Sequence, residues 1–334
     1  MSAMKLRLTS QAYQGAEAIS QSNIDALVQQ GRDYYESGQF AQAATVWEQA
    51  ASSFTTQGDG LNQAMVLSNL SLAYQRLGQW TRAKDAIAKS LDLLQSTTDT
   101  SPSRIRILAQ ALNTQGSLQL AQGQTEQALA TWQKAEATYQ QANDNAGIIR
   151  SQINQAQALK TLGFYRRALT LLTQVYHTLQ QQSDSPIKAA GLRSLGSAFL
   201  LVGNVEQSRQ VLQQSLNVAQ NLKLVGDMSA TLYDLGNTAK VGQDTNAALE
   251  YYQQAAAIAT EPLTKIQAQL NQLRLLIEAQ QWSAARTLSS EIKSQLDNLP
   301  PSRAAIYAQI DLSMSLLKLS EFNSQSSGQF GASQ

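Results

Sequence analysis

Small residues and bulky apolar residues return together along this chain in a pattern that repeats seven times. The first copy has Gly31, Gly38 and Ala43, followed by Trp47. Small residues at helical spacing predict places where two helices approach closely, and bulky residues predict what fills the gap between them. The first small residue of each copy serves as a marker: Gly31, Ser71, Gly116, Ala156, Gly196, Gly236 and, as a departure from the pattern, Leu273.

Each copy predicts a pair of helices. The marker lies in the first helix, which ends near a Gly that tolerates a left-handed backbone, as at Gly38 and Gly163. The second helix carries an Ala and, four positions on, a bulky residue on the same face. The five prolines fall between copies, where a helix has to stop: Pro102, Pro186, Pro262, Pro300 and Pro301. Side chains placed to cap the next helix are expected at Asp59, Asp144 and Ser302.

The predicted fold is therefore all-α, a solenoid of about seven helix–turn–helix repeats over residues 24–296. An amphipathic helix over 303–320 is expected to cover the last exposed apolar face. Residues 1–23 form an N-terminal extension, and the Ser-, Gly- and Gln-rich residues 321–334 are expected to be a disordered tail.

Charge and composition narrow the function. Lys plus Arg is 25 and Asp plus Glu is 24, so the net charge of +1 gives no bulk attraction to nucleic acid or to an anionic membrane. No stretch is apolar enough for a signal peptide or a membrane span, so the default location is cytoplasmic, or extracytoplasmic if a leader has been removed. With no cysteine, disulfides, thiolate metal sites and a cysteine nucleophile are excluded.

Catalytic machinery is not expected. The chain has no phosphate-binding loop, nucleophile elbow or zinc-hydrolase motif. A single histidine, His177, without an acidic cluster beside it predicts a structural residue rather than a ligand or a base. We expect no cofactor and no metal, and the four tryptophans are interpreted as core residues, with Trp80 and Trp282 near turns and partly exposed.

The repeated phrase resembles the tetratricopeptide repeat over roughly residues 24–296. Its intervals of 40, 45, 40, 40, 40 and 37 residues exceed the usual 34 and are similar to the long repeats of kinesin light chains. The first copy also resembles the opening repeat of bacterial proteins that pair such repeats with a caspase-like CHAT domain, whose His–Cys dyad this chain cannot form. The resemblance implies a right-handed superhelix whose first helices line a concave groove.

By that resemblance, a set of polar and aromatic residues on the first helices is predicted to face the groove. The set is Arg32, Tyr35, Asn69, Arg76, Asn113, Arg150, Asn154, Gln157, Lys160, Arg193, Ser197, Tyr233, Asn237, Lys240, Asn271 and Arg274. Asn69, Asn154 and Asn271 share one register and resemble the asparagine ladder with which long-repeat relatives hold a peptide backbone. The alternative is that these polar residues only solvate the inner wall.

Cations outnumber acidic residues on the predicted lining, which favours an acidic peptide. The Lys/Asn set of a carboxylate clamp for chaperone tails is incomplete. The leading interpretation is a non-catalytic interaction scaffold that binds an extended, acidic peptide or protein segment. The alternative is a regulatory or sensor domain that controls an associated effector, such as a CHAT-type domain, through a ligand-induced change of superhelix shape. Self-association through uncapped ends is compatible with either.

Overall fold

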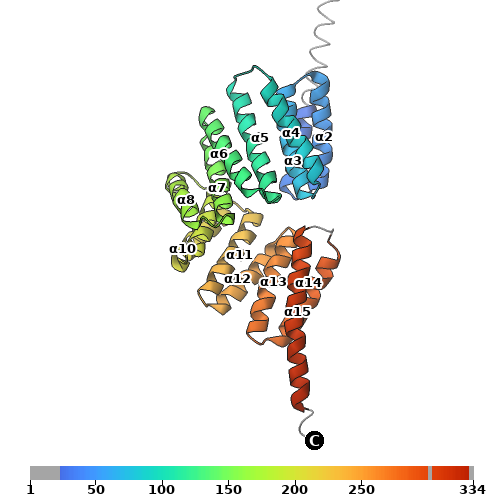
Figure 1. The fold of residues 1–334 in the computed structure, drawn as a ribbon, viewed down its shortest axis with the longest axis vertical. Helices are drawn as coiled ribbons and strands as arrows, with labels where there is room; N and C mark the ends of the chain where they lie inside the picture. The colour runs from blue at the N-terminus through green and yellow to red at the C-terminus, as the bar shows by residue number, and fades with distance from the viewer. Residues whose placement is uncertain (1–22, 300–302, 331–334) are drawn as a thin grey trace, which may run out of the picture. The chain divides into compact units, whose positions relative to one another are not determined.

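The computed structural model describes residues 23–299 and 303–330, and every regular element among them is an α-helix. Two compact units divide the chain, an N-terminal unit over Met1–Leu162 and a C-terminal unit over Gly163–Gln334. Each unit is a series of helices joined by short turns (Figure 1).

Helices of the N-terminal unit begin with the helical residues 23–36. They continue with α2 (Phe40–Gln57), α3 (Gly60–Arg76), α4 (Trp80–Ser96), α5 (Pro102–Ala121), α6 (Thr125–Gln141) and α7 (Asn145–Thr161). The C-terminal unit contains α8 (Tyr165–Gln180), α9 (Pro186–Leu201), α10 (Val205–Asn221), α11 (Val225–Val241), α12 (Thr245–Ile258), α13 (Pro262–Glu278), α14 (Trp282–Asp297) and α15 (Arg303–Phe330).

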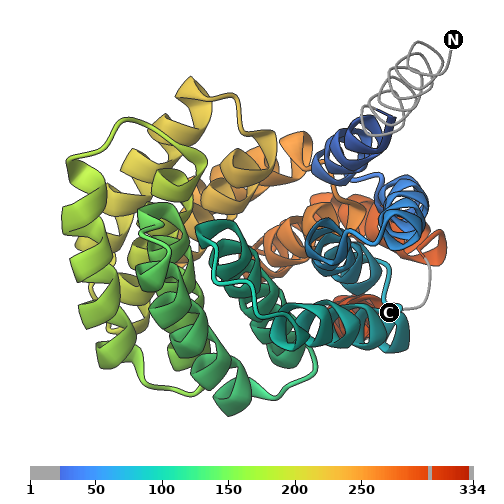
Figure 2. The same cartoon turned by 90° about the horizontal axis from the view of Figure 1, so that it is seen from above.

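Most predicted pairs are confirmed as helical hairpins within one unit: 23–36 with α2, α3 with α4, α5 with α6, α9 with α10, α11 with α12 and α13 with α14. Seen from above, a short turn joins the two helices of a hairpin such as α5–α6 (Figure 2). Of the predicted fourth pair, α7 belongs to the N-terminal unit and α8 to the C-terminal unit. First helices of neighbouring hairpins also pack together, as α3 does with α5 and α9 with α11. We call α3, α5, α7 in one unit and α9, α11, α13, α15 in the other the first-helix rows.

Side-chain size at the marker is matched by the residue sixteen positions later. A Cβ atom added to Gly31 or Gly116 would lie 2.3 or 2.5 Å from the indole nitrogen of Trp47 or Trp132. The largest marker has the smallest counterpart: sixteen positions after Leu273, the marker that departs from the pattern, lies the buried Ser289. The seven pairs are Gly31/Trp47, Ser71/Ile87, Gly116/Trp132, Ala156/Leu172, Gly196/Leu212, Gly236/Tyr252 and Leu273/Ser289, of which Gly196/Leu212 combines a small marker with a residue of only intermediate size. Protein interiors are packed to a nearly constant density, so a larger marker requires a smaller residue in contact with it. The last repeat therefore keeps the hairpin although its large and small positions are exchanged.

The N-cap residues and helix-starting prolines that the sequence predicts are found where the structure describes them. Asp59 accepts a hydrogen bond from the backbone N–H of Asn62 (3.0 Å), and Asp144 accepts one from Gly147 (2.9 Å), as predicted. Pro102, Pro186 and Pro262 each begin a helix. Of the remaining predictions, Ser302, Pro300 and Pro301 lie outside the described residues. Trp47 and Trp132 are buried and Trp282 is partly buried, as predicted, whereas Trp80 is 43% exposed and is not a core residue.

The last helix is longer than the sequence predicts. The expected capping helix, 303–320, lies within α15, but α15 continues through 321–330, where a disordered tail was expected. Extending an existing helix costs far less than starting one, because each added residue gains a hydrogen bond without a new nucleus. The rest of the predicted tail, 331–334, and the N-terminal residues 1–22 lie outside the described residues.

Candidate binding surface on the first helices

A polar network connects the first helices of the C-terminal unit. The Asn271 side-chain amide on α13 donates to the Tyr233 hydroxyl (3.0 Å) and to Asn237 Oδ1 (3.4 Å), both on α11. Arg274, one turn further along α13, donates to Asn271 Oδ1 (3.1 Å) and to the Asp311 carboxylate on α15 (2.7 Å). Of these five residues, all but Asp311 belong to the predicted groove set. The network joins three consecutive first helices, α11, α13 and α15, through their side chains.

Tyr252 ties this network to a second helix. Its hydroxyl on α12 donates to Asn237 Oδ1 at 2.8 Å. Burial raises the pKa of the Tyr252 phenol, and neighbouring Tyr233 adds to the shift, while the Arg274 guanidinium opposes it. The phenol therefore stays protonated and keeps its role as a donor. Asn237 Oδ1 is consequently occupied by two donors from the protein itself.

An ion pair extends the row toward α9. Arg193 Nη1 on α9 lies 3.7 Å from the Asp234 carboxylate on α11. Together with the Arg274–Asp311 pair, this contact neutralises two of the cations that the sequence assigned to the lining. In the C-terminal unit, the cation excess that favours an acidic partner is thus smaller than the count of Arg and Lys indicates.

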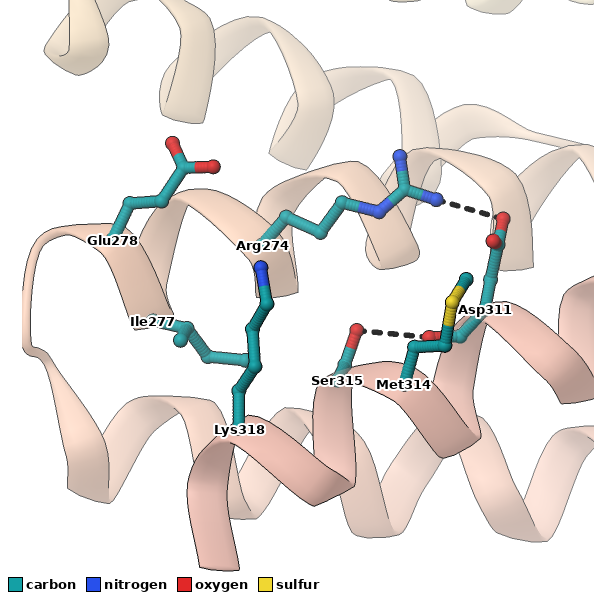
Figure 3. Close-up of a pocket in the computed structure, with 7 residues that line it drawn as sticks. All are labelled: Arg274, Ile277, Glu278, Asp311, Met314, Ser315 and Lys318. Atoms are coloured by element: carbon teal, nitrogen blue, oxygen red, sulfur yellow. Dashed lines mark hydrogen bonds and ion pairs between the residues drawn. The ribbon is translucent and has the colours of Figure 1, made fainter. Parts of the chain in front are cut away.

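A cavity of about 360 Å³ opens beside this network, between α13 and α15 (Figure 3). Arg274 and Asp311 lie on one side of it, and the Lys318 side chain extends toward it from α15. Ile277 and Met314 supply an apolar part of the wall. The complete lining is Arg274, Ile277, Glu278, Asp311, Met314, Ser315 and Lys318. The cavity thus offers a cationic group and an apolar surface next to each other.

Polar contacts also connect the first helices of the N-terminal unit. The Ser68 hydroxyl on α3 donates to Thr114 on α5 (3.0 Å), and both side chains are buried. Asn113 Oδ1 on α5 accepts from Ser151 (3.3 Å) and from the Asn154 amide (3.4 Å) on α7. These side chains therefore bridge successive hairpins in the first-helix row, as their counterparts do in the C-terminal unit.

The predicted groove residues divide by exposure. Exposed members are Arg32, Arg76, Arg150, Gln157 and Lys240; half-buried members are Tyr35, Asn69, Asn154, Lys160, Arg193, Ser197, Tyr233, Asn237 and Arg274; buried members are Asn113 and Asn271. The asparagine register is not uniform. Asn69 is half-buried, whereas Asn271 is 9% exposed and fully engaged by protein groups. Asn271 is thus part of the internal polar network and solvates the wall hardly at all.

Four residues of α15 that line this cavity were missed by the sequence analysis: Asp311, Met314, Ser315 and Lys318. Residues 303–320 were taken only as a cap. The signal that could have found them is the buried stripe of α15, because Ala305, Ala308, Leu312 and Leu319 pack against the preceding hairpin as a first helix does. A helix in that position continues the row and contributes to its lining.

Comparison with known families bears on this repeated architecture. Residues 23–96 match the sequence model of the tetratricopeptide repeat, which covers the helical residues 23–36, α2, α3 and α4. Residues 23–96 therefore contain tetratricopeptide repeats. The hairpins beyond the matched residues repeat the same spacing of marker and turn, with Leu273 as the departure. No curated protein sequence matches the chain significantly.

Solved structures share the tetratricopeptide-like fold at low sequence identity. Aspartyl phosphate phosphatase F from Bacillus subtilis aligns with a TM-score of 0.62 and 13% identity, over 90% of this chain and 76% of its own. The Rap conjugation gene regulator of plasmid pLS20, in complex with the Phr* peptide, gives 0.60 and 13%, over 90% and 75%. BtubC (BKLC) from P. vanneervenii gives 0.52 and 18%, over 67% and 89%. These likenesses establish the all-helical repeat fold.

No helix within the described residues is both long enough and apolar enough to cross a bilayer. His177 lies exposed on α8, with its ring edge-on to Tyr176 at 5.8 Å between centroids. Nowhere in 23–299 or 303–320 do three or more His, Asp or Glu side chains gather as a metal would require.

Proposed function

We propose that this protein is a non-catalytic interaction scaffold that binds an extended peptide segment along the first-helix row of its C-terminal unit. The observation that carries this proposal is the cavity between α13 and α15, which adjoins the polar network of the row. Of the similar structures, the Rap regulator is described in complex with a peptide, which agrees with the proposal.

The spacing of the row suits an extended chain. Packed helices lie about 8–10 Å apart, and an extended peptide rises about 3.3 Å per residue, so roughly every third peptide residue meets a new helix. The Tyr233 hydroxyl hydrogen and the Asn237 side-chain N–H groups, which make none of the internal bonds described above, are donors that can pair with a peptide backbone without reading its sequence. The cavity then supplies side-chain specificity at the α15 end of the row.

An acidic ligand fits the charges left after the internal pairs are made. In the C-terminal row, Lys240 is exposed at the end of α11, and Lys318 lines the cavity. Glu278, which also lines the cavity, opposes them. The remaining excess of one cation favours a peptide with a carboxylate near Lys318, and this attraction should weaken with salt.

Reversing the two lysine charges tests the groove. We expect Lys240→Glu with Lys318→Glu to weaken binding of peptides selected on the wild-type protein from a random twelve-residue display library by roughly tenfold. Both side chains are exposed, so the melting temperature should hardly change. The matched control is Lys293→Glu on α14, an exposed lysine of a second helix, which should leave affinity unchanged. Failure to select any peptide, or equal affinity for the double variant, contradicts the proposal.

The regulatory alternative makes a different prediction for the same peptides. If a ligand changes the pitch of the helical repeats, small-angle scattering will show a change in radius of gyration on peptide binding. A scaffold binds with the radius unchanged. The non-catalytic assignment in either case rests on the absence of cysteine and on the isolated, exposed position of His177.

Self-association finds support in the outer face of α15. Opposite its buried stripe, the helix exposes a second apolar stripe formed by Ile306, Tyr307, Ile310, Met314 and Leu317. Leu317 is 61% exposed and Met314 is 54% exposed, so much of the stripe is accessible to solvent. Because the stripe is uncharged, it is complementary to a second copy of itself, as a twofold interface requires.

We expect the protein to form a concentration-dependent dimer, and Ile310→Glu with Leu317→Glu to shift it to the monomer in sedimentation velocity. Burying two carboxylates in an apolar contact is costly, whereas both positions are about half exposed or more in the single chain, so the fold should survive. A monomeric wild type at high concentration contradicts self-association through α15.

A further inference from the structure

One turn at the start of a second helix departs from all the others. The residue that precedes each second helix is its N-cap, and it is polar in the turns before α2, α4, α6, α10, α12 and α14: Gln39, Gln79, Gln124, Asn204, Asp244 and Gln281. Before α8 it is Phe164, which is 48% exposed and makes no capping hydrogen bond. A phenyl ring in water at an N-cap stabilises neither the helix nor the core, so folding does not account for it.

Further apolar side chains surround Phe164 within the C-terminal unit. Tyr165 at the start of α8 and Leu201 and Val202 at the end of α9 are all exposed, and with Phe164 they line a hollow of about 530 Å³. We call Phe164, Tyr165, Leu201 and Val202 the turn-edge patch. Its hollow falls within the range of sites that hold small ligands or side chains. The residues of the first-helix binding proposal are not part of it.

Two arginines give the patch its charge. Arg166 and Arg167 line the same hollow, and no acidic side chain does. Arg167 lies over the Phe164 ring, with its guanidinium carbon 5.3 Å from the ring centroid. Within the described part of the chain, neither guanidinium forms an ion pair, in contrast to Arg82 at the start of α4, which pairs with Glu48 at 2.6 Å. Two adjacent cations without carboxylates leave a local positive potential beside apolar surface.

We infer that the turn-edge patch is a second docking surface, which takes an acidic protein segment with a large apolar side chain next to Asp or Glu. The apolar side chain enters the hollow among Phe164, Leu201 and Val202, and the carboxylates pair with Arg166 and Arg167. Two cations are fewer than the clusters of four to eight that typify anionic-lipid recognition. A hollow of this volume suits a side chain better than a flat bilayer surface.

Defined peptides test this assignment. The probe is a fluorescein-labelled twelve-residue peptide that alternates Asp or Glu with Phe or Leu; one control replaces its acids by Lys and another replaces its apolar residues by Ser. The acidic–apolar peptide is expected to bind, both controls to bind at least roughly tenfold more weakly, and Arg166→Glu with Arg167→Glu to weaken it by a similar factor. Equal binding of the three peptides, no binding, or no effect of the double variant overturns the inference.

The same titration distinguishes this surface from other sites. The Lys240→Glu, Lys318→Glu variant should bind the probe as the wild type does, and loss of binding there places the probe on the first-helix row and overturns the inference. Vesicles containing phosphatidylserine serve as the second ligand. Vesicle binding that requires Arg166 and Arg167, without peptide binding, assigns the patch to a membrane surface instead and also overturns it.

A variant at Phe164 excludes the explanation that binding is lost through unfolding. Phe164→Asn supplies the cap that α8 lacks, so the melting temperature is expected to rise by about 1–3 °C while the probe is lost. The matched control, Gln124→Asn at the N-cap of α6, should raise the melting temperature similarly and leave probe binding intact. Retained binding by Phe164→Asn contradicts the patch.

Discussion

Replacing Gly116 by Ala lowers the free energy of unfolding by about 2–3 kcal/mol, although Ala is the better helix former. The new methyl carbon would lie 2.5 Å from Nε1 of Trp132. The indole cannot move aside freely, because it is 2% exposed and its Nε1 donates to the Asn113 carbonyl at 3.1 Å. Overpacking of this kind forces either an unfavourable rotamer or a shift of α5 against α6.

A double-mutant cycle identifies the cause. Trp132→Leu alone costs about 2–3 kcal/mol through the cavity that it leaves, but the added methyl of Gly116→Ala then partly fills that space. The double variant should therefore lose less than the sum of the singles by at least about 1.5 kcal/mol, which chemical unfolding followed by circular dichroism can measure. Strict additivity would show that the marker and the bulky residue do not pack against each other.

Replacing Asn271 by Leu is the second change with a large expected effect, about 2–3 kcal/mol of lost stability. Leu has the same number of side-chain heavy atoms in the same branched arrangement, so no cavity is left, but the hydrogen bonds to Tyr233 and Asn237 and from Arg274 are all removed. The remaining polar groups stay in a half-buried setting with fewer partners. Thermal melting should show the loss in the C-terminal unit.

Asn69 supplies the matched comparison, because it holds the same register in α3. Its side chain is half-buried, and no side-chain hydrogen bond ties it to the described residues. We expect Asn69→Leu to change stability by less than about 0.5 kcal/mol. Similar losses for the two variants would mean that the shared register, and not the network around Asn271, determines stability.

Sequence reasoning recovered the fold because its signals are local. Gly116 and Trp132 lie sixteen positions apart in one hairpin, and the turn between their helices is short, so size at one position constrains size at the other. Asp59 and Asp144 cap helices that begin at the next residue. Such relations are contained in a few turns of helix and can be read along the chain.

The geometry of the candidate site could be predicted from the sequence only in part, because it depends on contacts between hairpins. Arg193 and Arg274 were correctly placed on the first helices, but their partners Asp234 and Asp311 lie about one repeat away. The repeat interval predicts that such helices are neighbours. It does not predict which side-chain rotamers bring two charges together. Arg193 and Arg274 were therefore counted as free cations, although both are paired.

The sequence by itself therefore determined an all-α chain of tetratricopeptide-type hairpins, their boundaries and their core, because each hairpin is specified by its own periodicity. Only the tertiary structure decided which polar side chains of the rows are internal and which remain exposed. It also revealed the cavity beside α15 and the apolar patch around Phe164. Those features arise where side chains of different helices come together, and their geometry depends on distances that no single helix encodes.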